Sequence, residues 1–464
     1  MRFPIQRVSL HDPHGYIFCH DNKFYRVVLQ NYQQNYDKLI GTNLFKILIE
    51  KGLLISHSEV SLQDLGLEND GSIYKVLLAK QLDFISYPQE WSFSMLQDAA
   101  ITTLEVQAKA LEKGFALKDA SAYNIQFQDG KPIFIDTLSF EIYENGTAWQ
   151  AYRQFCQHFL APLYLMAYTD TQLNQLFGVM KDGIPLNLAA KLLPIKARLN
   201  MGALWHIFFH AQAENNTAKA TVKKNHAKPN KNFTLAFLQQ LTESLLSTIK
   251  KLSYKTKAHW SQYYQINVEA AYLANKITTI NKFLSQSNTQ YLWDLGTNTG
   301  DFSVLAMEKG IKTVSFDYDH DSIEVFYKKM KENSNLSKLS LPLILNLAVP
   351  TAASGWANKE RKSWTERNLP DTLLALALIH HIRISDNISL EEIANLFSKI
   401  APQLIIEFIP KEDEKVQILL QNKIDFYQDY TQESFEIIFK QYYSLVISQK
   451  LLPSNRILYL FVNK

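Results

Sequence analysis

The chain has 464 residues, 47% of them hydrophobic, so it is too long for one compact core and apolar enough to fill two or three domains. Its formal net charge of +3 is nearly neutral, so the composition requires neither a polyanionic partner nor an anionic membrane surface, and nucleic acid is not indicated. The two cysteines, Cys19 and Cys156, have no metal-ligand spacing, which argues against a disulfide scaffold or a structural zinc site.

Residues 1–212 predict a domain of mixed α and β structure. Short strand-like runs come first: YIFCH at 16–20, KFYRVVL at 23–29 and YKVLLAK at 74–80. Helices dominate later, and one of them has an apolar stripe that stops at Gly114. The stripe consists of Leu96, Ala100, Leu104, Ala108 and Leu111.

A polar constellation follows this helix, in the segment KDASAYNIQFQDGKPIFID at 118–136. Asp119 and Asn124 are five residues apart, and Asp136 follows a predicted hairpin with an Asp-Gly turn. The order resembles that of protein kinases and aminoglycoside phosphotransferases. The resemblance implies a catalytic-loop Asp119, with Asn124 and Asp136 as magnesium ligands in a kinase-like cleft.

The same region departs from the kinase pattern. Leu117 stands where a histidine is usual, Asp136-Thr137-Leu138 lacks the glycine of the magnesium motif, and no glycine-rich loop precedes the strands. Arg26 and Lys75 are the candidates for the nucleotide-binding lysine. We favour a degenerate kinase-like domain that holds substrate or nucleotide. An active phosphotransferase with magnesium-nucleotide, and a coincidental helix-loop-hairpin, remain the alternatives.

The composition changes at residues 213–232, which are rich in Lys, Asn and Ala and predict a flexible basic linker. A helical lead-in is expected over 233–285. Within it, Leu273, Ile277, Ile280 and Leu284 repeat at helical spacing.

Strand-like and helical segments alternate in residues 286–464. This alternation predicts an α/β domain with a doubly wound, mostly parallel sheet and an antiparallel hairpin at one edge. The expected strands are 291–295, 313–317, 341–347, 372–379 and 403–409, followed by the hairpin around SLVISQ and RILYLFV.

The first predicted strand of this domain runs into the segment DLGTNTG at 294–300. In open α/β sheets, ligands bind beyond the carboxyl ends of the strands. A carboxylate at Asp294 suits the ammonium of a methionyl group and would repel a pyrophosphate, and the spacing is not GxGxxG. Asp317 ends the second strand, where it can accept both ribose hydroxyls. Taken singly, Asp294 could be a helix cap and Asp317 a turn residue.

DLGTNTG followed by VSFDYD resembles the first two motifs of class I S-adenosylmethionine-dependent methyltransferases. LKDASAYNIQF, PIFIDTLSFE, YRQFCQHFLAPL and IIEFIPKED extend the resemblance to a bacterial family of two-part methyltransferases. The resemblance implies that Asp294, Gly296 and Gly300 line the methionyl side, Asp317 the ribose and Asn346 the adenine. Members of the family more often have Asp at this last position. Three neighbouring residues complete the predicted cofactor site: Thr297, Asn298 and Tyr318.

His380 and His381 follow the fourth predicted strand and are the candidate catalytic residues, because a histidine can take a proton from an attacking hydroxyl or amine. The alternative is a pair of histidines that only bond to backbone. No Asn-Pro-Pro-aromatic element follows this strand, which disfavours nucleobase and amide nitrogens as acceptors. Trp260, Tyr263 and Tyr264 could form a lid, or pack against the sheet.

The combined prediction is a fused protein that binds S-adenosylmethionine and no metal in its methyltransferase domain, with an unidentified methyl acceptor. Phosphoryl transfer by the front domain and a non-catalytic adenosylmethionine-binding module are the rival hypotheses. The N-terminus lacks the apolar core of a signal peptide, and the longest apolar runs are strand-sized. We therefore expect a cytoplasmic protein with no membrane partner.

Overall fold

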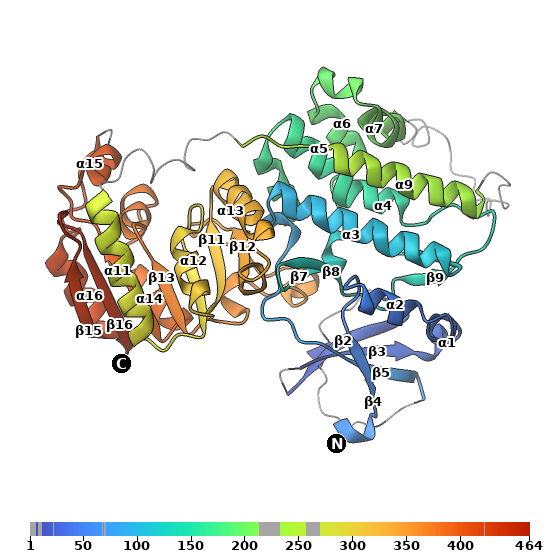
Figure 1. The fold of residues 1–464 in the computed structure, drawn as a ribbon, viewed down its shortest axis with the longest axis horizontal. Helices are drawn as coiled ribbons and strands as arrows, with labels where there is room; N and C mark the ends of the chain where they lie inside the picture. The colour runs from blue at the N-terminus through green and yellow to red at the C-terminus, as the bar shows by residue number, and fades with distance from the viewer. Residues whose placement is uncertain are drawn as a thin grey trace. The chain divides into compact units, whose positions relative to one another are not determined.

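The computed structural model divides into two compact units (Figure 1). Unit 1 comprises Met1–Lys255 and Ala353–Lys362, and unit 2 comprises Thr256–Ala352 and Ser363–Lys464. No helix among the described residues is both long and apolar enough to cross a membrane. The structure describes residues 6–7, 12–21, 23–66, 68, 71–212, 233–256, 270–421 and 423–464.

Unit 1 begins with a five-stranded antiparallel sheet in the order β1-β2-β3-β5-β4. Its strands are β1 (Gln6–Arg7), β2 (Gly15–His20), β3 (Lys23–Leu29), β4 (His57–Val60) and β5 (Ile73–Ala79). Two helices, α1 (Gln33–Gly41) and α2 (Leu44–Glu50), separate β3 from β4. The three strand-like runs predicted for this region are confirmed as β2, β3 and β5.

The predicted apolar stripe forms α3 (Phe93–Glu112), a 20-residue helix whose buried face includes Leu96, Ala100 and Leu104. Two small antiparallel sheets follow. One pairs β6 (Phe115–Leu117) with β9 (Phe140–Ile142), and the other pairs β7 (Ile125–Gln128) with β8 (Lys131–Phe134). The predicted hairpin turn between β7 and β8 is confirmed, since Asp129 and Gly130 both have positive φ angles of 52° and 74°.

The remainder of unit 1 is helical. Its described α-helices include α4 (Tyr152–Phe155), α5 (Ala161–Tyr168), α6 (Leu186–Leu192), α7 (Met201–Ala203) and α9 (Leu235–Lys251), with shorter helical segments between them. The predicted linker at 213–232 lies outside the described residues, as do Trp260, Tyr263 and Tyr264.

The predicted helical lead-in at 233–285 contains helices that fall in different units. Its first helix, α9, belongs to unit 1, where the Gln97 side chain on α3 donates to the carbonyls of Ile249 and Leu252, both at 2.8 Å. Its second helix, α11 (Ala270–Gln286), belongs to unit 2. The sequence did not indicate this division, because an amphipathic helix does not reveal in its own sequence which neighbour covers its apolar face.

Unit 2 contains a seven-stranded sheet in the order β12-β11-β10-β13-β14-β16-β15. The first five strands in this order are parallel, whereas β16 is antiparallel to both β14 and β15. This confirms the predicted doubly wound sheet and its antiparallel hairpin. The strands are β10 (Tyr291–Leu295), β11 (Lys312–Asp317), β12 (Ser340–Ile344), β13 (Thr372–Ala375), β14 (Gln403–Phe408), β15 (Tyr443–Lys450) and β16 (Ile457–Asn463).

The helices of unit 2 connect and cover these strands (Figure 1). On α11, Ile280 and Leu284 enter a core shared with Leu292 of β10 and Ile405 of β14, as the helical spacing predicted. The other helices are α12 (Asp301–Glu308), α13 (His320–Glu332), α14 (Leu390–Ile400), α15 (Glu414–Leu420) and α16 (Gln432–Tyr442). Because chain order reverses on either side of β10, the carboxyl ends of β10, β11 and β13 mark the position where such sheets bind ligands.

Candidate cofactor and acceptor site

A glycine-bearing turn connects β10 to α12. Its backbone requires positive φ angles at Gly296 (76°), Asn298 (52°) and Gly300 (81°). A Cβ atom on Gly300 would lie 2.3 Å from the ring of Phe326 on α13, so only glycine allows this close approach. The backbone amide of Gly296 donates to the Phe316 carbonyl at 2.8 Å, which holds the turn against the end of β11.

Asp294 lies at the carboxyl end of β10 and is 2% exposed. Its Oδ2 accepts hydrogen bonds from Thr297 Oγ1 at 2.8 Å and Ser303 Oγ at 2.6 Å. Oδ1 has no hydrogen-bond donor among the described residues. Burial raises the pKa of Asp294 to about 6, although the two hydroxyls and the charge of Lys276 oppose this change. Thr297 thus orients the carboxylate of Asp294. Its predicted contact with the cofactor stays a prediction.

Asp317 ends β11 and is tied to the same turn. Its Oδ2 accepts from the Asn298 amide at 2.7 Å, and its Oδ1 accepts from the Asp319 amide at 2.9 Å. Burial raises the pKa of Asp317 to about 6, with the two amides acting in the opposite direction. The neighbouring Tyr318 is exposed, as a residue that contacts a ligand at the rim can be. The structure therefore brings the predicted residues Asp317, Asn298 and Tyr318 together.

Asn346 does not end a strand, because β12 stops at Ile344. Its side chain is exposed, and its Oδ1 accepts from the Ala348 amide at 2.9 Å within a local turn. The oxygen that was predicted to read the adenine amino group is thus already used by the backbone. Contact between Asn346 and adenine stays a prediction.

The two candidate histidines lie side by side, with ring centroids 4.2 Å apart, but they differ in exposure. The strand predicted over 372–379 ends at Ala375, and a left-handed residue, Ala377 (φ 47°), turns the chain before His380 and His381. His380 is 2% exposed, its Nδ1 has no partner among the described residues, and burial keeps its pKa well below 6.5. His381 is exposed at the surface. Partial removal of its imidazole from water lowers the pKa of His381, and the negative charge of Asp386 partly offsets this change.

A buried ion pair beside this turn was not anticipated. Lys276 Nζ on α11 lies 2.7 Å from Glu407 Oε2 on β14, and both side chains are fully buried. Glu407 Oε1 accepts from the Tyr272 hydroxyl at 2.6 Å, and Oε2 also accepts from the Ala377 amide at 3.0 Å. Burial would raise the pKa of Glu407, but the charges of Lys276 and Arg456 outweigh it and lower that pKa. Glu407 thus holds the left-handed turn that leads to the histidines.

Two of the predicted kinase-like residues, Asn124 and Asp136, lie close together in unit 1, beside the guanidinium of Arg26. Arg26 Nη2 on β3 lies 2.6 Å from Asp136 Oδ1, and Arg26 Nη1 lies 3.6 Å from Asp12 Oδ2. The Ser139 hydroxyl donates to the other oxygen of Asp136 and accepts from Asn124 Nδ2 at 3.3 Å. Asp136 is therefore neutralised by Arg26, so its oxygens are engaged where a kinase would bind magnesium.

Asp119 lies in the loop between β6 and β7, where its Oδ1 accepts from the Ser121 amide at 2.9 Å. Burial, and then the charge of Asp136, raise the pKa of Asp119. Within the described residues, no group of three or more His, Cys, Asp and Glu side chains could hold a metal ion.

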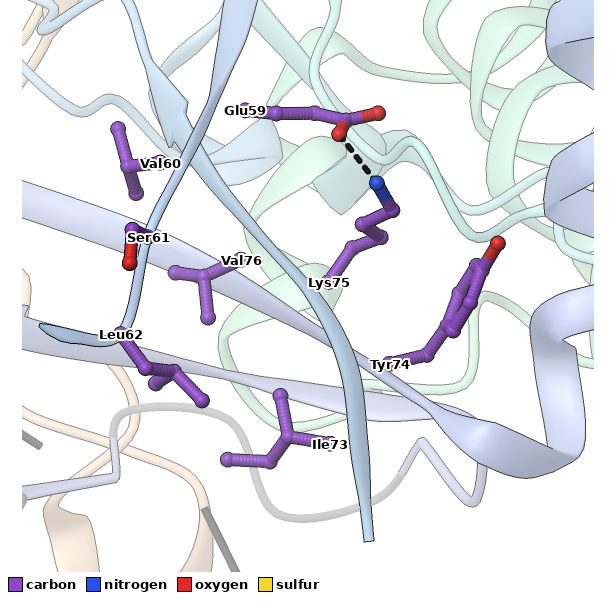
Figure 2. A pocket seen from close by; sticks show the side chains of 8 residues that line it. All are labelled: Glu59, Val60, Ser61, Leu62, Ile73, Tyr74, Lys75 and Val76. Atoms are coloured by element: carbon purple, nitrogen blue, oxygen red, sulfur yellow. Dashed lines mark hydrogen bonds and ion pairs between the residues drawn. The ribbon is translucent and has the colours of Figure 1, made fainter. Parts of the chain in front are cut away.

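Lys75, the second candidate for the nucleotide-binding lysine, points elsewhere. Its Nζ lies 2.6 Å from Glu59 Oε2, and both line a pocket of about 350 Å³ on β4 and β5 (Figure 2). The remaining lining residues are Val60, Ser61, Leu62, Ile73, Tyr74 and Val76. Of the two candidates, Arg26 therefore reaches the predicted cleft, whereas Lys75 pairs with Glu59.

No protein-family model matches the chain. The chain is 33% identical over 461 residues to the nodulation protein NoeA of Rhizobium meliloti (strain 1021), and the alignment covers 98% of this chain and 95% of that protein.

Several solved structures resemble part of the chain. Magnesium protoporphyrin IX methyltransferase of Synechocystis PCC 6803, crystallised with bound S-adenosylmethionine, is 14% identical with a TM-score of 0.32, covering 45% of this chain and 93% of that one. WbdD is 18% identical with a TM-score of 0.31, covering 45% and 44%. The N-methyltransferase NodS of Bradyrhizobium japonicum WM9 is 12% identical with a TM-score of 0.31, covering 42% and 98%.

Proposed function

The chain belongs to the family of the nodulation protein NoeA, and from this premise we propose that it is a class I S-adenosylmethionine-dependent methyltransferase whose active site lies in unit 2. One observation carries the proposal. Two buried carboxylates, Asp294 and Asp317, lie at the carboxyl ends of adjacent parallel strands and are both bonded to the glycine turn at the point where chain order reverses.

The residues fit this cofactor by charge. Asp294 Oδ1 is free of protein donors among the described residues and can receive the ammonium of the methionyl group, while Asp317 accepts from the ribose hydroxyls. A pyrophosphate would meet two carboxylates and be repelled. Tyr318 and Asn346 lie next along the same edge of the sheet, where we place the adenine.

When bound, S-adenosylmethionine supplies a methyl group on a sulfonium, which is already activated for transfer. The protein's task is then to orient the acceptor nucleophile in line with that methyl group and to accept a proton where the acceptor carries one. We assign the proton to His381, because its lowered pKa keeps the imidazole neutral near pH 7. Glu407 and Lys276 fix the turn that presents it.

Replacing Asp317 by alanine should weaken S-adenosylmethionine binding about ten- to a hundred-fold. Hydrogen bonds to a charged group contribute roughly 1.5–3 kcal/mol each, and water replaces part of the loss. Calorimetric titration of the full-length variant measures the effect, with Asp301→Ala as the matched control, since Asp301 pairs with Lys329 on the surface. Unchanged affinity in Asp317→Ala would remove this residue from the site.

The acceptor can be identified by incubating the protein with methyl-labelled cofactor and a cell lysate, and then determining which molecule carries the label. Label on a small molecule, protein or nucleic acid defines the acceptor class. Cofactor binding without any labelled product, even with fractionated lysates, would support the rival reading of a non-catalytic adenosylmethionine-binding module.

We further propose that unit 1 is a kinase-like scaffold that does not transfer phosphate, because Arg26 supplies the positive charge that Asp136 would otherwise receive from magnesium. Magnesium-ATP should therefore leave the melting temperature of the full-length protein unchanged. In Arg26→Ala, Asp136 loses its cation, and stabilisation by magnesium becomes measurable. Stabilisation of the wild-type protein by magnesium-ATP, lost in Asp136→Asn, would instead favour the phosphotransferase alternative.

A further inference from the structure

Unit 1 carries a cluster of large apolar side chains on its surface, which we call the apolar patch. It comprises Ile195, Leu199, Met201, Trp205 and Phe209, whose exposed fractions are 83, 87, 60, 57 and 43%. The residues belong to the short helix Ile195–Leu199, to α7 and to the helical segment that directly continues α7, and these elements contact one another. Trp205 and Phe209 pack edge to face, with ring centroids 5.0 Å apart. This concentration of exposed apolar side chains in a few turns of chain is typical of a binding surface.

The patch rests on a firmly packed base. The same turns direct Ala197, Ala203 and Ile207 inward, where all three are fully buried. Asn200 Oδ1 caps α7 by accepting from the Gly202 amide at 3.0 Å, and it also accepts from the Tyr164 hydroxyl at 2.7 Å. The inward positions are thus already satisfied, and the outward apolar residues remain uncovered within unit 1.

The stretch of chain that carries the patch has formal charges of one sign. Between residues 183 and 212 the only formally charged side chains are Lys191, Lys196 and Arg198, all exposed, and the stretch contains no Asp or Glu. The Arg198 guanidinium lies 5.1 Å from the centroid of the Phe208 ring, so a cation sits directly beside the apolar surface.

We propose that unit 1 docks on the surface of an anionic lipid membrane through the apolar patch. Tryptophan and phenylalanine favour the boundary between headgroups and acyl chains, and flanking Lys and Arg side chains reach anionic headgroups. Protein interfaces, in contrast, are depleted of lysine. The near-neutral net charge of the whole chain predicted no membrane partner. A net charge summed over 464 residues does not reveal a local cluster of basic side chains. The proposal is independent of methyl transfer.

Co-sedimentation of the full-length protein with vesicles tests this. The protein should sediment with vesicles of phosphatidylcholine that contain about one-third phosphatidylglycerol. Raising the salt concentration should release part of the bound protein. Ile195→Asp with Leu199→Asp should lower the partition coefficient roughly tenfold or more. Lys196→Glu with Arg198→Glu should remove the preference for anionic over purely phosphatidylcholine vesicles.

Ile437→Asp is the matched control, since Ile437 is 58% exposed on α16 of unit 2, and it should bind vesicles like the wild type. Melting curves of every variant confirm that the fold is retained. Equal vesicle binding by the wild type and Ile195→Asp/Leu199→Asp, or no binding by either, overturns the proposal. The proposal is also overturned if Ile195→Asp/Leu199→Asp changes an oligomeric wild type to a monomer in sedimentation velocity without changing vesicle binding. The patch would then be a subunit interface.

Discussion

Replacing Glu407 by leucine is expected to lower the free energy of unfolding by about 3–5 kcal/mol, because the buried Lys276 ammonium would lose the carboxylate that lies 2.7 Å from it. The Ala377 amide would also lose its acceptor, in a turn that already holds a non-glycine residue at positive φ. Denaturant unfolding of the full-length protein, read from the transition of unit 2, measures the change.

Two further variants isolate the pair. Lys276→Met combined with Glu407→Leu should recover most of the stability, since the two charges are then removed together. Lys440→Met is the control, because Lys440 and Glu436 form a partly exposed pair on α16, and its loss should cost less than about 1 kcal/mol. If Glu407→Leu is no more destabilising than Lys440→Met, the ion pair has no structural role.

Replacing His381 by alanine is expected to reduce the turnover of methyl transfer by about a hundredfold while leaving cofactor affinity nearly unchanged, because a general base acts in the transition state. The wild-type profile of turnover against pH should have an acidic limb below pH 6.5, in keeping with the lowered pKa of His381. At saturating cofactor, where the pH dependence of cofactor binding does not contribute, that limb should vanish in the variant.

His20→Ala is the matched control, since His20 lies on β2 of unit 1 and pairs with Asp21. It should leave both turnover and the pH profile unaltered. Normal turnover in His381→Ala, measured with the identified acceptor, would leave His381 with a structural role only, and His380 is too deeply buried to replace it without a rearrangement.

Local sequence pattern was enough to predict the parts of the fold that depend on local chemistry. The 3.6-residue spacing predicted α3 and α11, and the Asp129-Gly130 turn predicted the β7–β8 hairpin. The glycines at 296 and 300 mark a turn whose positive φ angles few other residues adopt. Asp294 and Asp317 could be placed at strand ends because the strands before them are apolar and short.

Features that depend on distant parts of the chain escaped prediction. The spacing of apolar residues on α11 says nothing about the partner of Lys276, because only the fold places it against Glu407, 131 residues away. A glutamate inside the apolar strand QLIIEFI was the available signal of a buried charge pair. The early end of β13 could not be foreseen either, because it depends on Ala377 adopting a left-handed conformation that alanine rarely takes.

Calorimetric titration of S-adenosylmethionine into the full-length protein is the decisive measurement of cofactor binding by unit 2. We expect one site per chain and an affinity that rises with pH, because the ammonium needs an ionised Asp294 and the ribose an ionised Asp317. With both pKa values raised to about 6, only about one in ten of each carboxyl group is ionised near pH 5, so binding there should be at least tenfold weaker than at about pH 7.5. Asp294→Asn should bind weakly at both pH values. No binding heat at about pH 7.5, or equal affinity in the wild type and in Asp294→Asn, would contradict the account.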